Sequence, residues 1–214
     1  MSTPPQAAES RGQGRPRETT QAWRKAERAR LLAERQAIPT ARRQRMTPLI
    51  LDSIASHVPA LTGATVGIYW PFRGEIDIRS LASLHAESET VFALPVVVEY
   101  GAPLEFHRWR LGDRLIPGVW NIPVPARSEP VTPDLLLVPL LGHDAAGYRL
   151  GYGGGFYDRT LAAMQPRPRT VGIGYAYAAL DSIGPHAHDI PMDAIVTENA
   201  YVEFAHGAGR GGQA

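Results

Sequence analysis

After Pro59, short runs of apolar and β-branched residues alternate with segments that have a helical pattern. Two of these runs are VFALPVVV (91–98) and DLLLVP (134–139), the second of which is apolar after Asp134. Such unbroken apolar stretches predict central strands that are covered on both faces. The run LEFHRWRL (104–111) alternates between apolar and polar residues and predicts an edge hairpin. Strands that alternate with helices predict an α/β layered domain, in which helices flank a central, mostly parallel mixed sheet.

The segment that precedes this pattern is helical in character. Residues 19–38, TTQAWRKAERARLLAERQAI, are rich in helix formers and carry apolar residues on one side and arginines on another, so they predict a long amphipathic helix. A second helix is predicted to begin at Thr47-Pro48, because a capping residue is followed there by proline. Residues 1–18 and 206–214 have few apolar side chains and predict disordered tails around a single catalytic domain, 19–205.

The composition limits the chemistry that the chain can perform. Hydrophobic residues make up 44% of the 214 residues and charged residues 20%, which is typical of a globular protein. The sequence contains no cysteine, so thiolate metal sites and cysteine nucleophiles are excluded. No apolar run approaches the ~20 residues of a membrane helix, and the N-terminus lacks the pattern of a secretory signal. We therefore expect a cytoplasmic protein with no membrane partner.

Positive charge is concentrated near the N-terminus. The first 46 residues contain eleven of the 22 basic residues and only four acids, although the net charge of the whole chain is +1. Such a segment can bind nucleic acid, can supply cations to an anionic small molecule, or can be a solvated tail and helix face. Composition alone leaves these three interpretations open.

The most unusual local feature is RLGYGGGFYDR, residues 149–159. A predicted buried strand comes before it. Its glycines belong to a predicted loop, 142–155, and a helical pattern begins directly after that loop. In such an arrangement, backbone N–H groups and a helix N-terminus can hold phosphate. The stretch lacks the Gly-Lys-Ser/Thr ending of a Walker A motif, and Phe156 stands where a Rossmann motif has its third glycine. Arg149 and Asp158 flank the glycines and offer a cation for phosphate and a carboxylate for Mg²⁺. The alternative is a glycine-rich turn that serves packing.

These residues resemble a known family. GYRLGYGGGFYDRTL is similar to the signature of the 5-formyltetrahydrofolate cyclo-ligases, also called methenyltetrahydrofolate synthetases. GIYWPFRGEIDIRSL resembles the family's folate-contacting segment, and VGIGYAY with HDIPMDAIVTE resembles its C-terminal segment. The arginine-rich first helix resembles its ATP-contacting N-terminus. The pieces occur in the family's order across residues 21–200.

The resemblance implies a fold and a reaction. The fold is similar to that of sugar-phosphate isomerases and CoA transferases. The reaction is the ATP- and Mg²⁺-dependent conversion of 5-formyltetrahydrofolate to 5,10-methenyltetrahydrofolate, with release of ADP and phosphate, through a phosphorylated formyl group. Such phosphoryl transfer needs positioning and surrounding cations rather than a protein nucleophile. Mg²⁺ is the implied cofactor and ATP the implied co-substrate.

The resemblance also implies roles for individual residues. The catalytic residues would be Arg149, Tyr157 and Asp158. The residues that bind ATP would be Arg24, Lys25, Arg28, Arg149, Leu150, Gly151, Tyr152, Gly153, Gly154, Gly155, Phe156 and Tyr157. Folate would contact Trp70, Glu75, Tyr152, Gly153, Gly154, Gly155 and Phe156. The metal ligands would be Asp158 and Asp193.

Some points stay open at this stage. The family has a lysine where this chain has Arg24, so either Arg24 or Lys25 can be the first phosphate contact. There are two alternatives to this function. One is an ATP-using enzyme of the same fold that acts on another substrate, and the other is a nucleic-acid-binding module that uses the basic N-terminus. The predicted partners are small molecules and not nucleic acid, and the predicted state is a monomer or weak homodimer.

Overall fold

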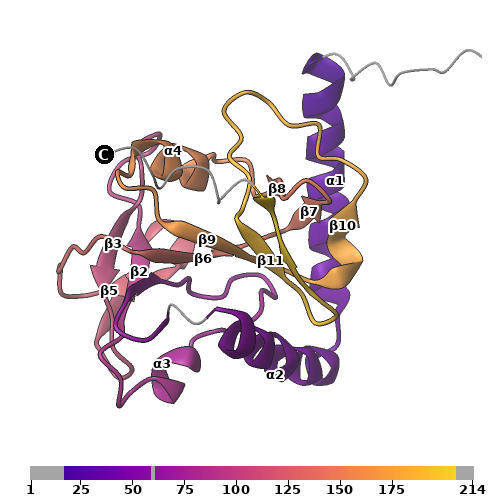
Figure 1. Ribbon diagram of the computed structural model, residues 1–214. Helices are drawn as coiled ribbons and strands as arrows, with labels where there is room; N and C mark the ends of the chain where they lie inside the picture. Colours follow the sequence, from indigo (N-terminus) through magenta and orange to yellow (C-terminus); the bar gives the residue numbers. More distant parts are fainter. Residues whose placement is uncertain (1–16, 59–60, 206–214) are drawn as a thin grey trace, which may run out of the picture.

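The computed structural model describes residues 17–58 and 61–205, so the predicted tails lie, apart from residues 17 and 18, outside the described residues. Its centre is a seven-stranded sheet in the order β12-β11-β9-β6-β1-β2-β3 (Figure 1). Strands β11, β9, β6, β1 and β2 pair in parallel, whereas β12 and β3 pair antiparallel at the two edges. The strands are β1 (Thr65–Gly67), β2 (Val91–Val96), β3 (Glu105–Arg108), β6 (Leu135–Pro139), β9 (Arg169–Ile173), β11 (Ala194–Val196) and β12 (Tyr201–Glu203). The predicted mixed sheet and the edge position of residues 105–108 are confirmed.

Helices cover both faces of this sheet. Leu135 and Leu137 of β6 pack in one hydrophobic cluster with residues of α2 (Thr40–His57) and α3 (Leu81–Leu84). Leu136 and Val138 pack in a second cluster with residues of α4 (Phe156–Ala163). Alternate residues of a strand point to opposite faces, so an unbroken apolar run is what a doubly covered central strand requires. Figure 1 shows α4 on one side of the sheet and α2 and α3 on the other.

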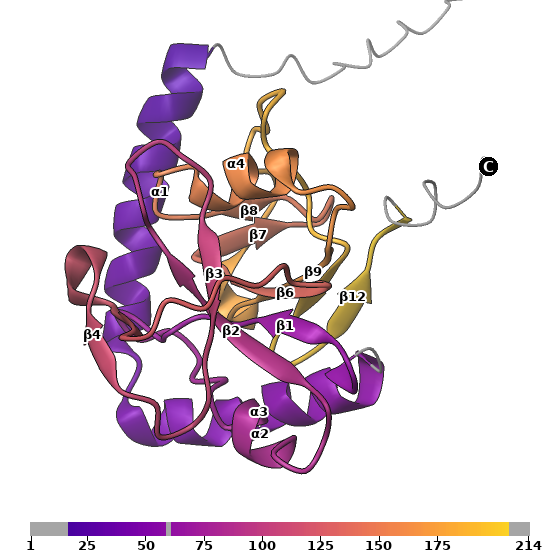
Figure 2. The same cartoon turned by 90° about the vertical axis from the view of Figure 1, so that its left-hand side faces the viewer.

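The long helix α1 (Arg17–Ala37) lies beside the sheet rather than on either face (Figures 1 and 2). Leu31 is fully buried and packs in a third cluster with Leu141, Leu150 and Ile183. The predicted helix is confirmed, and it begins at Arg17, two residues inside the predicted tail. This position brings the arginines of α1 towards the loops at one end of the sheet.

The second helix is longer than the sequence predicts. It begins at Thr40 and contains Pro48 in its interior, so the prediction of a start at Thr47-Pro48 is wrong. Met46, Ile50 and Ile54 are all buried on one face, and this packing begins before the proline and continues after it. Tertiary packing of an apolar face therefore outweighs the cost of one interior proline. Residues 78–88, IRSLASLHAES, have a helical pattern in the sequence, but the structure forms only the single turn α3 within them.

Residues 142–150, predicted as loop, form strands β7 (Gly142–Asp144) and β8 (Arg149–Leu150) of a second sheet, in the order β10-β7-β8 with β10 (Ala179–Leu180). The strands were missed because they are two or three residues long. Leu150 and Leu141 pack against α1, so this small sheet attaches α1 to the rest of the molecule. A further unpredicted hairpin joins β4 (Leu115–Pro117) to β5 (Pro123–Pro125) through the short turn η2 (Val119–Asn121).

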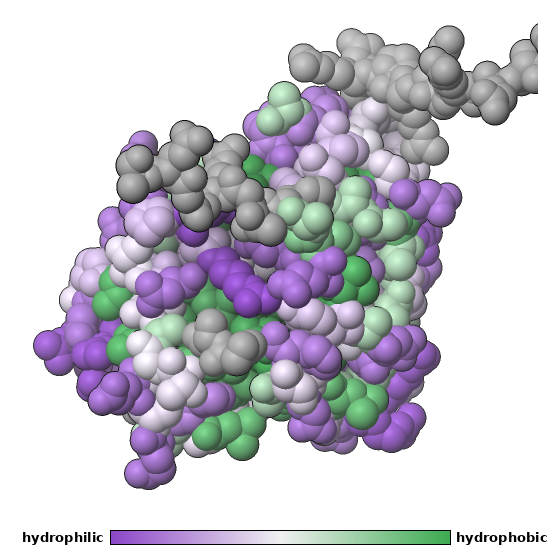
Figure 3. Space-filling model, viewed as in Figure 1, coloured by the Kyte–Doolittle hydropathy of each residue, from purple (hydrophilic) through white to green (hydrophobic). Residues whose placement is uncertain are grey.

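The surface is mixed in character. On the face viewed in Figure 3, hydrophilic and hydrophobic residues alternate in small groups. Among the helices within 17–58 and 61–205, none combines the length and the apolar character that crossing a membrane requires.

Candidate active site

A cleft with a volume of about 250 Å³ lies at the carboxyl ends of β1 and β6. The chain leaves β1 towards β2 on one side and leaves β6 towards β9 on the other, so the cleft occupies the point where the strand order changes direction. In open α/β sheets this is the usual position of a ligand site. The walls come from α1, the segment after β1, the β4–β5 hairpin and the glycine loop, 151–155.

The glycine loop has a backbone that side chains would not tolerate. Gly153 has a φ of 96° and Gly155, which caps α4, a φ of 63°, both in the left-handed region. A Cβ on Gly154 would lie 2.9 Å from the ring of Phe156. Gly153 and Gly154 are exposed to solvent. The main chain of the loop is therefore accessible to a ligand, which a phosphate cradle would require.

Arg149 and Asp158 are paired at the base of this loop. Nη2 of Arg149 donates to Oδ1 of Asp158 over 2.7 Å, and Nη1 donates to the carbonyl of Ile190 over 2.6 Å. The N–H of Ile190 donates to the same Oδ1. Within the described part of the chain, Oδ2 of Asp158 accepts no hydrogen bond, and both side chains line the cleft. One carboxylate oxygen and one buried guanidinium are thus fixed in the lining of the cleft.

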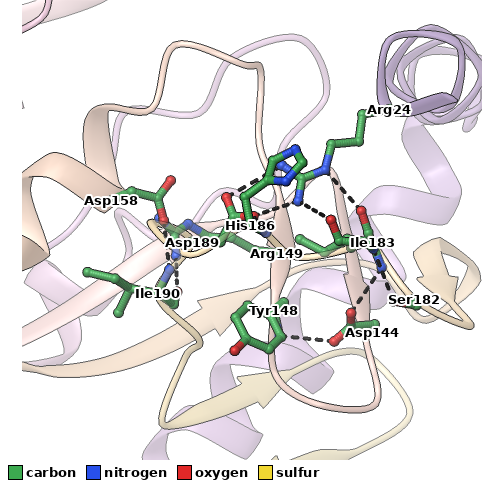
Figure 4. A network of polar contacts seen from close by, with 11 residues as sticks. Arg24, Asp144, Tyr148, Arg149, Asp158, Ser182, Ile183, His186, Asp189 and Ile190 are labelled. Atoms are coloured by element: carbon green, nitrogen blue, oxygen red, sulfur yellow. Dashed lines mark hydrogen bonds and ion pairs between the residues drawn. The ribbon is translucent and has the colours of Figure 1, made fainter. Parts of the chain in front are cut away.

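The two predicted arginines of α1 reach the cleft and Lys25 does not. Figure 4 shows Arg24 extending from α1 towards the loop that carries Asp189. Nη2 of Arg24 lies 2.5 Å from Oδ2 of Asp189, and its Nε donates to the carbonyl of Ile183. Arg28 donates from Nε to the carbonyl of Gly151 over 2.8 Å. Burial, together with the charge of Arg24, lowers the pKa of Arg28. Lys25 is exposed and is absent from the cleft lining, so Arg24 is the better placed of the two candidates.

Trp70 and Glu75 line the same cleft, although the sequence separates them from the glycine loop. The side chain of Glu75 is only 5% exposed. Its Oε2 accepts a hydrogen bond of 2.9 Å from the N–H of Phe72, and its Oε1 accepts one of 3.0 Å from the hydroxyl of Tyr152. Burial raises the pKa of Glu75. Trp70 is fixed by Trp109 at its edge and by the guanidinium of Arg79, 4.1 Å from a ring centroid.

Three further predicted residues differ in their placement. Tyr157 lines the cleft, and its burial raises the pKa of its hydroxyl well above the usual range. The side chain of Leu150 is buried against α1 and does not line the cleft. Gly151 lines it and is held by Arg28.

Asp193, predicted as the second metal ligand, is not brought into the cleft. Its Oδ2 accepts hydrogen bonds from the N–H and the hydroxyl of Thr170, and its Oδ1 accepts one from Arg167. It ties the start of β11 to the start of β9. Across residues 17–58 and 61–205, no group of three or more histidines or carboxylates could hold a metal ion. The chain thus offers Mg²⁺ the free Oδ2 of Asp158 beside the cradle, whereas Asp193 as placed does not fit this role.

Sequence reasoning missed two residues of this region. Trp120 lines the cleft from the tip of the β4–β5 hairpin, with its ring centroid 6.0 Å from that of Phe156, and it has a φ of 56°. Arg35 lies under the cleft and reaches Tyr152. The spacing of Arg24, Arg28 and Arg35 on one helix face was a signal for Arg35. No comparable pattern pointed to Trp120, since its hairpin was not predicted.

The model of the 5-formyltetrahydrofolate cyclo-ligase family matches residues 20–198. The chain belongs to this family. It is 30% identical over 178 residues to the 5-formyltetrahydrofolate cyclo-ligase of Escherichia coli K12, a match that covers 79% of this chain and 97% of that protein. The cyclo-ligase of Mycolicibacterium smegmatis is 29% identical over 182 residues, covering 79% and 91%. The predicted family resemblance is confirmed.

Two solved structures have the same fold as this member of the cyclo-ligase family. The NMR structure of Aquifex aeolicus 5,10-methenyltetrahydrofolate synthetase superimposes with a TM-score of 0.74 at 27% identity, covering 89% of this chain and 95% of the other. A 5,10-methenyltetrahydrofolate synthetase from Mycoplasma pneumoniae has a TM-score of 0.67 at 21% identity, covering 82% and 98%. The layered α/β architecture predicted from the sequence is therefore that of the family.

Proposed function

We propose that this chain converts 5-formyltetrahydrofolate to 5,10-methenyltetrahydrofolate at the expense of ATP. One observation carries the proposal: Tyr152 of the glycine loop is hydrogen-bonded to Glu75 of the segment after β1. The glycine loop and a wall with an aromatic and a carboxylate side chain thus line one cleft, as a reaction between ATP and a pterin would require. The names of the relatives support the same substrate.

The nucleotide would occupy the part of the cleft formed by the glycine loop. Main-chain N–H groups of residues 153–155 and the start of α4 can hold phosphate oxygens, with Arg28 and Arg149 as cations at either side. Asp158 would contribute a carboxylate oxygen to Mg²⁺, whose role when bound is to offset the negative charge of the phosphates. Asp193 is not used in this proposal.

The folate would lie across the wall formed by Trp70 and Glu75. An aromatic ring can stack on the pterin, and the carboxylate of Glu75 can accept hydrogen bonds from pterin N–H groups. This would direct the N5-formyl group towards the end of the triphosphate. Trp120 and Phe156 would close the opposite side of the ring system and exclude water.

The reaction follows from this juxtaposition. The formyl oxygen attacks the γ-phosphorus, an O–P bond forms, and the bond to the bridging oxygen of ADP breaks. N10 then attacks the formyl carbon, its proton is released, and the C–O bond breaks as phosphate leaves. Arg149 and Arg28 stabilise the charge that spreads over the transferring group, and no protein nucleophile takes part.

The nucleic-acid alternative loses part of its basis. Arg24 and Arg35 are buried, and Arg28 is held by the glycine loop, so these arginines of α1 do not form an exposed basic face. A monomer or weak homodimer and a cytoplasmic location remain predictions.

The test is direct. Purified protein is mixed with 5-formyltetrahydrofolate, Mg²⁺ and ATP, and the near-ultraviolet absorbance of the methenyl product is followed. We expect the absorbance to rise only when ATP and Mg²⁺ are both present, with ADP released in equal amount. ADP release that ignores folate, or no product at all, would count against the proposal.

A further inference from the structure

Arg35 is among the largest side chains that are fully buried, and it does not line the cleft. Burial of a guanidinium is costly unless its N–H groups are satisfied. Nε donates to the carbonyl of Arg73 over 3.1 Å, Nη1 donates to the carbonyl of Leu140 over 3.3 Å, and Nη2 donates to the hydroxyl of Tyr152. One side chain from α1 thus joins the segment after β1, the end of β6 and the glycine loop.

The contacts of Arg35 converge on Glu75. Nη2 lies 3.9 Å from Oε1 of Glu75, and the hydroxyl of Tyr152 stands between the two, accepting from Arg35 and donating to Glu75. The guanidinium carbon lies 5.4 Å from the centroid of the Tyr152 ring. A chain of charge-assisted hydrogen bonds therefore runs from α1 through the glycine loop to the carboxylate.

The turn that leads to Glu75 needs such a support. Arg73 and Gly74 have φ values of 49° and 80°, so two consecutive residues adopt the left-handed region. A Cβ on Gly74 would lie 3.3 Å from the carbonyl oxygen of Arg35, which means that the turn packs directly on this part of α1. For Arg73, which is not glycine, this conformation is uncommon and persists only where the surroundings fix it.

We propose that Arg35 is a positioning residue that holds Tyr152 and the carboxyl group of Glu75 in one arrangement, and so couples the folate side of the cleft to the glycine loop. The expected effect of Arg35 on turnover rests on the proposed function. The geometry does not depend on that function, because the hydrogen-bond chain is formed by the protein alone.

The charges around Glu75 give the inference a measurable consequence. Burial raises the pKa of Glu75, and Arg35 acts against this rise, as do the hydrogen bonds from Phe72 and Tyr152. The other titratable groups that act on it electrostatically are the hydroxyls of Tyr69, Tyr157 and Tyr175. Removal of the guanidinium charge must therefore move the pKa of Glu75 further upward.

The variants are Arg35→Gln and Tyr152→Phe, each alone and combined with Glu75→Gln. Arg30→Gln is the matched control, because Arg30 lies on the same helix with an exposed side chain that pairs with Glu27 and Glu34. Tyr152→Phe removes only a hydroxyl from a residue that is 37% exposed, so it keeps the test valid if Arg35→Gln fails to fold.

The first measurement is kcat/KM for 5-formyltetrahydrofolate against pH. We expect Arg35→Gln to lower it about 100-fold at neutral pH, the order of loss that a small misplacement of reacting groups produces. The acid limb of the pH profile of kcat/KM should move to higher pH in Arg35→Gln. It should move less in Tyr152→Phe and should not move in Arg30→Gln. In the Glu75→Gln background the shift should disappear. A loss of activity that is equal at every pH in both variants would mean a purely structural role and would overturn the inference.

The second measurement needs no turnover. The carboxyl resonance of Glu75 is followed by NMR in protein labelled with ¹³C-glutamate and is assigned by its loss in Glu75→Gln. Its titration midpoint should rise in Arg35→Gln and Tyr152→Phe; an unchanged midpoint would overturn the inference. If the wild-type protein makes no methenyl product, the proposed function fails, while this titration still decides the role of Arg35.

Discussion

Arg24 of α1 and Asp189 of the loop before β11 form an ion pair across 165 positions of sequence, with Nη2 2.5 Å from Oδ2. The side chains are 8% and 12% exposed, and Arg24 also donates to the carbonyls of Ile183 and Gly184. The pair therefore attaches the loop at 183–189 to the first helix at the edge of the cleft.

Arg24→Met should destabilise the protein. The change removes the guanidinium from Asp189 and from two carbonyls, and the loss of one partner of a buried pair costs roughly 3 kcal/mol. Denaturant unfolding measures the free energy, with Lys25→Met as the control because Lys25 is exposed at the adjacent position. An equal effect of the two changes would contradict the structural role of the pair.

The pH dependence of stability should report the same pair. Although burial disfavours the charge of Asp189, the hydrogen bonds from Arg24 and from the N–H of His186 lower its pKa. A carboxylate whose pKa is lower in the folded state stabilises the protein above its unfolded pKa and loses this contribution as the pH falls through the folded value. The difference in unfolding free energy between wild type and Asp189→Asn should thus be largest near neutral pH and should vanish in acid. A difference that is constant with pH would exclude this cause.

Asp158→Asn should preserve the fold and impair the use of ATP. The amide can still occupy the position beside Arg149, but it removes the negative charge that would hold Mg²⁺. We expect kcat/KM for ATP to fall roughly 100-fold, the order that loss of one preorganised group at a transferring phosphoryl produces. Steady-state kinetics across a Mg²⁺ titration measure this, with the exposed Asp181→Asn as control. Unchanged kinetics would remove Asp158 from the site.

Gly154→Val should block the cradle without unfolding the protein. The new Cβ would lie 2.9 Å from Phe156, so the ring must turn into the space that a ligand would use. Because Gly154 is exposed, we expect the unfolding free energy to change by less than about 1 kcal/mol, while ATP binding by calorimetry is lost. Ala162→Val adds similar bulk on the exposed side of α4 and serves as the control. Retained ATP affinity in Gly154→Val would contradict the cradle.

Trp120→Ala should weaken folate binding more than ATP binding. The ring lies 51% exposed at the cleft and meets Phe156 edge-on, so it is available to stack on a second aromatic system. We expect KM for the folate to rise about 10-fold, equivalent to ~1.4 kcal/mol, and Trp120→Phe to recover part of the loss. If ATP binding alone were affected, the assignment of this wall to folate would be wrong.

Much of the fold could be predicted because its signals are local. The runs 91–98 and 135–139 are apolar on both faces, and they contain β2 and the central strand β6. The start of α2 could not be predicted, since Pro48 is a strong local signal and the packing of Met46, Ile50 and Ile54 that overrides it is not local. The strands of the β7–β8 and β4–β5 hairpins are too short to carry a periodic pattern.

The layered α/β class, the glycine loop between strand and helix, and the family signature follow from the sequence, because each depends on residues close together in the chain. Which of these residues meet depends on the three-dimensional fold. The fold brings Glu75 to Tyr152, turns Asp193 towards Thr170, and buries Arg35 between three segments. Such relationships depend on how strands order themselves in a sheet and on the burial of charge, and neither is encoded in the spacing of any one motif.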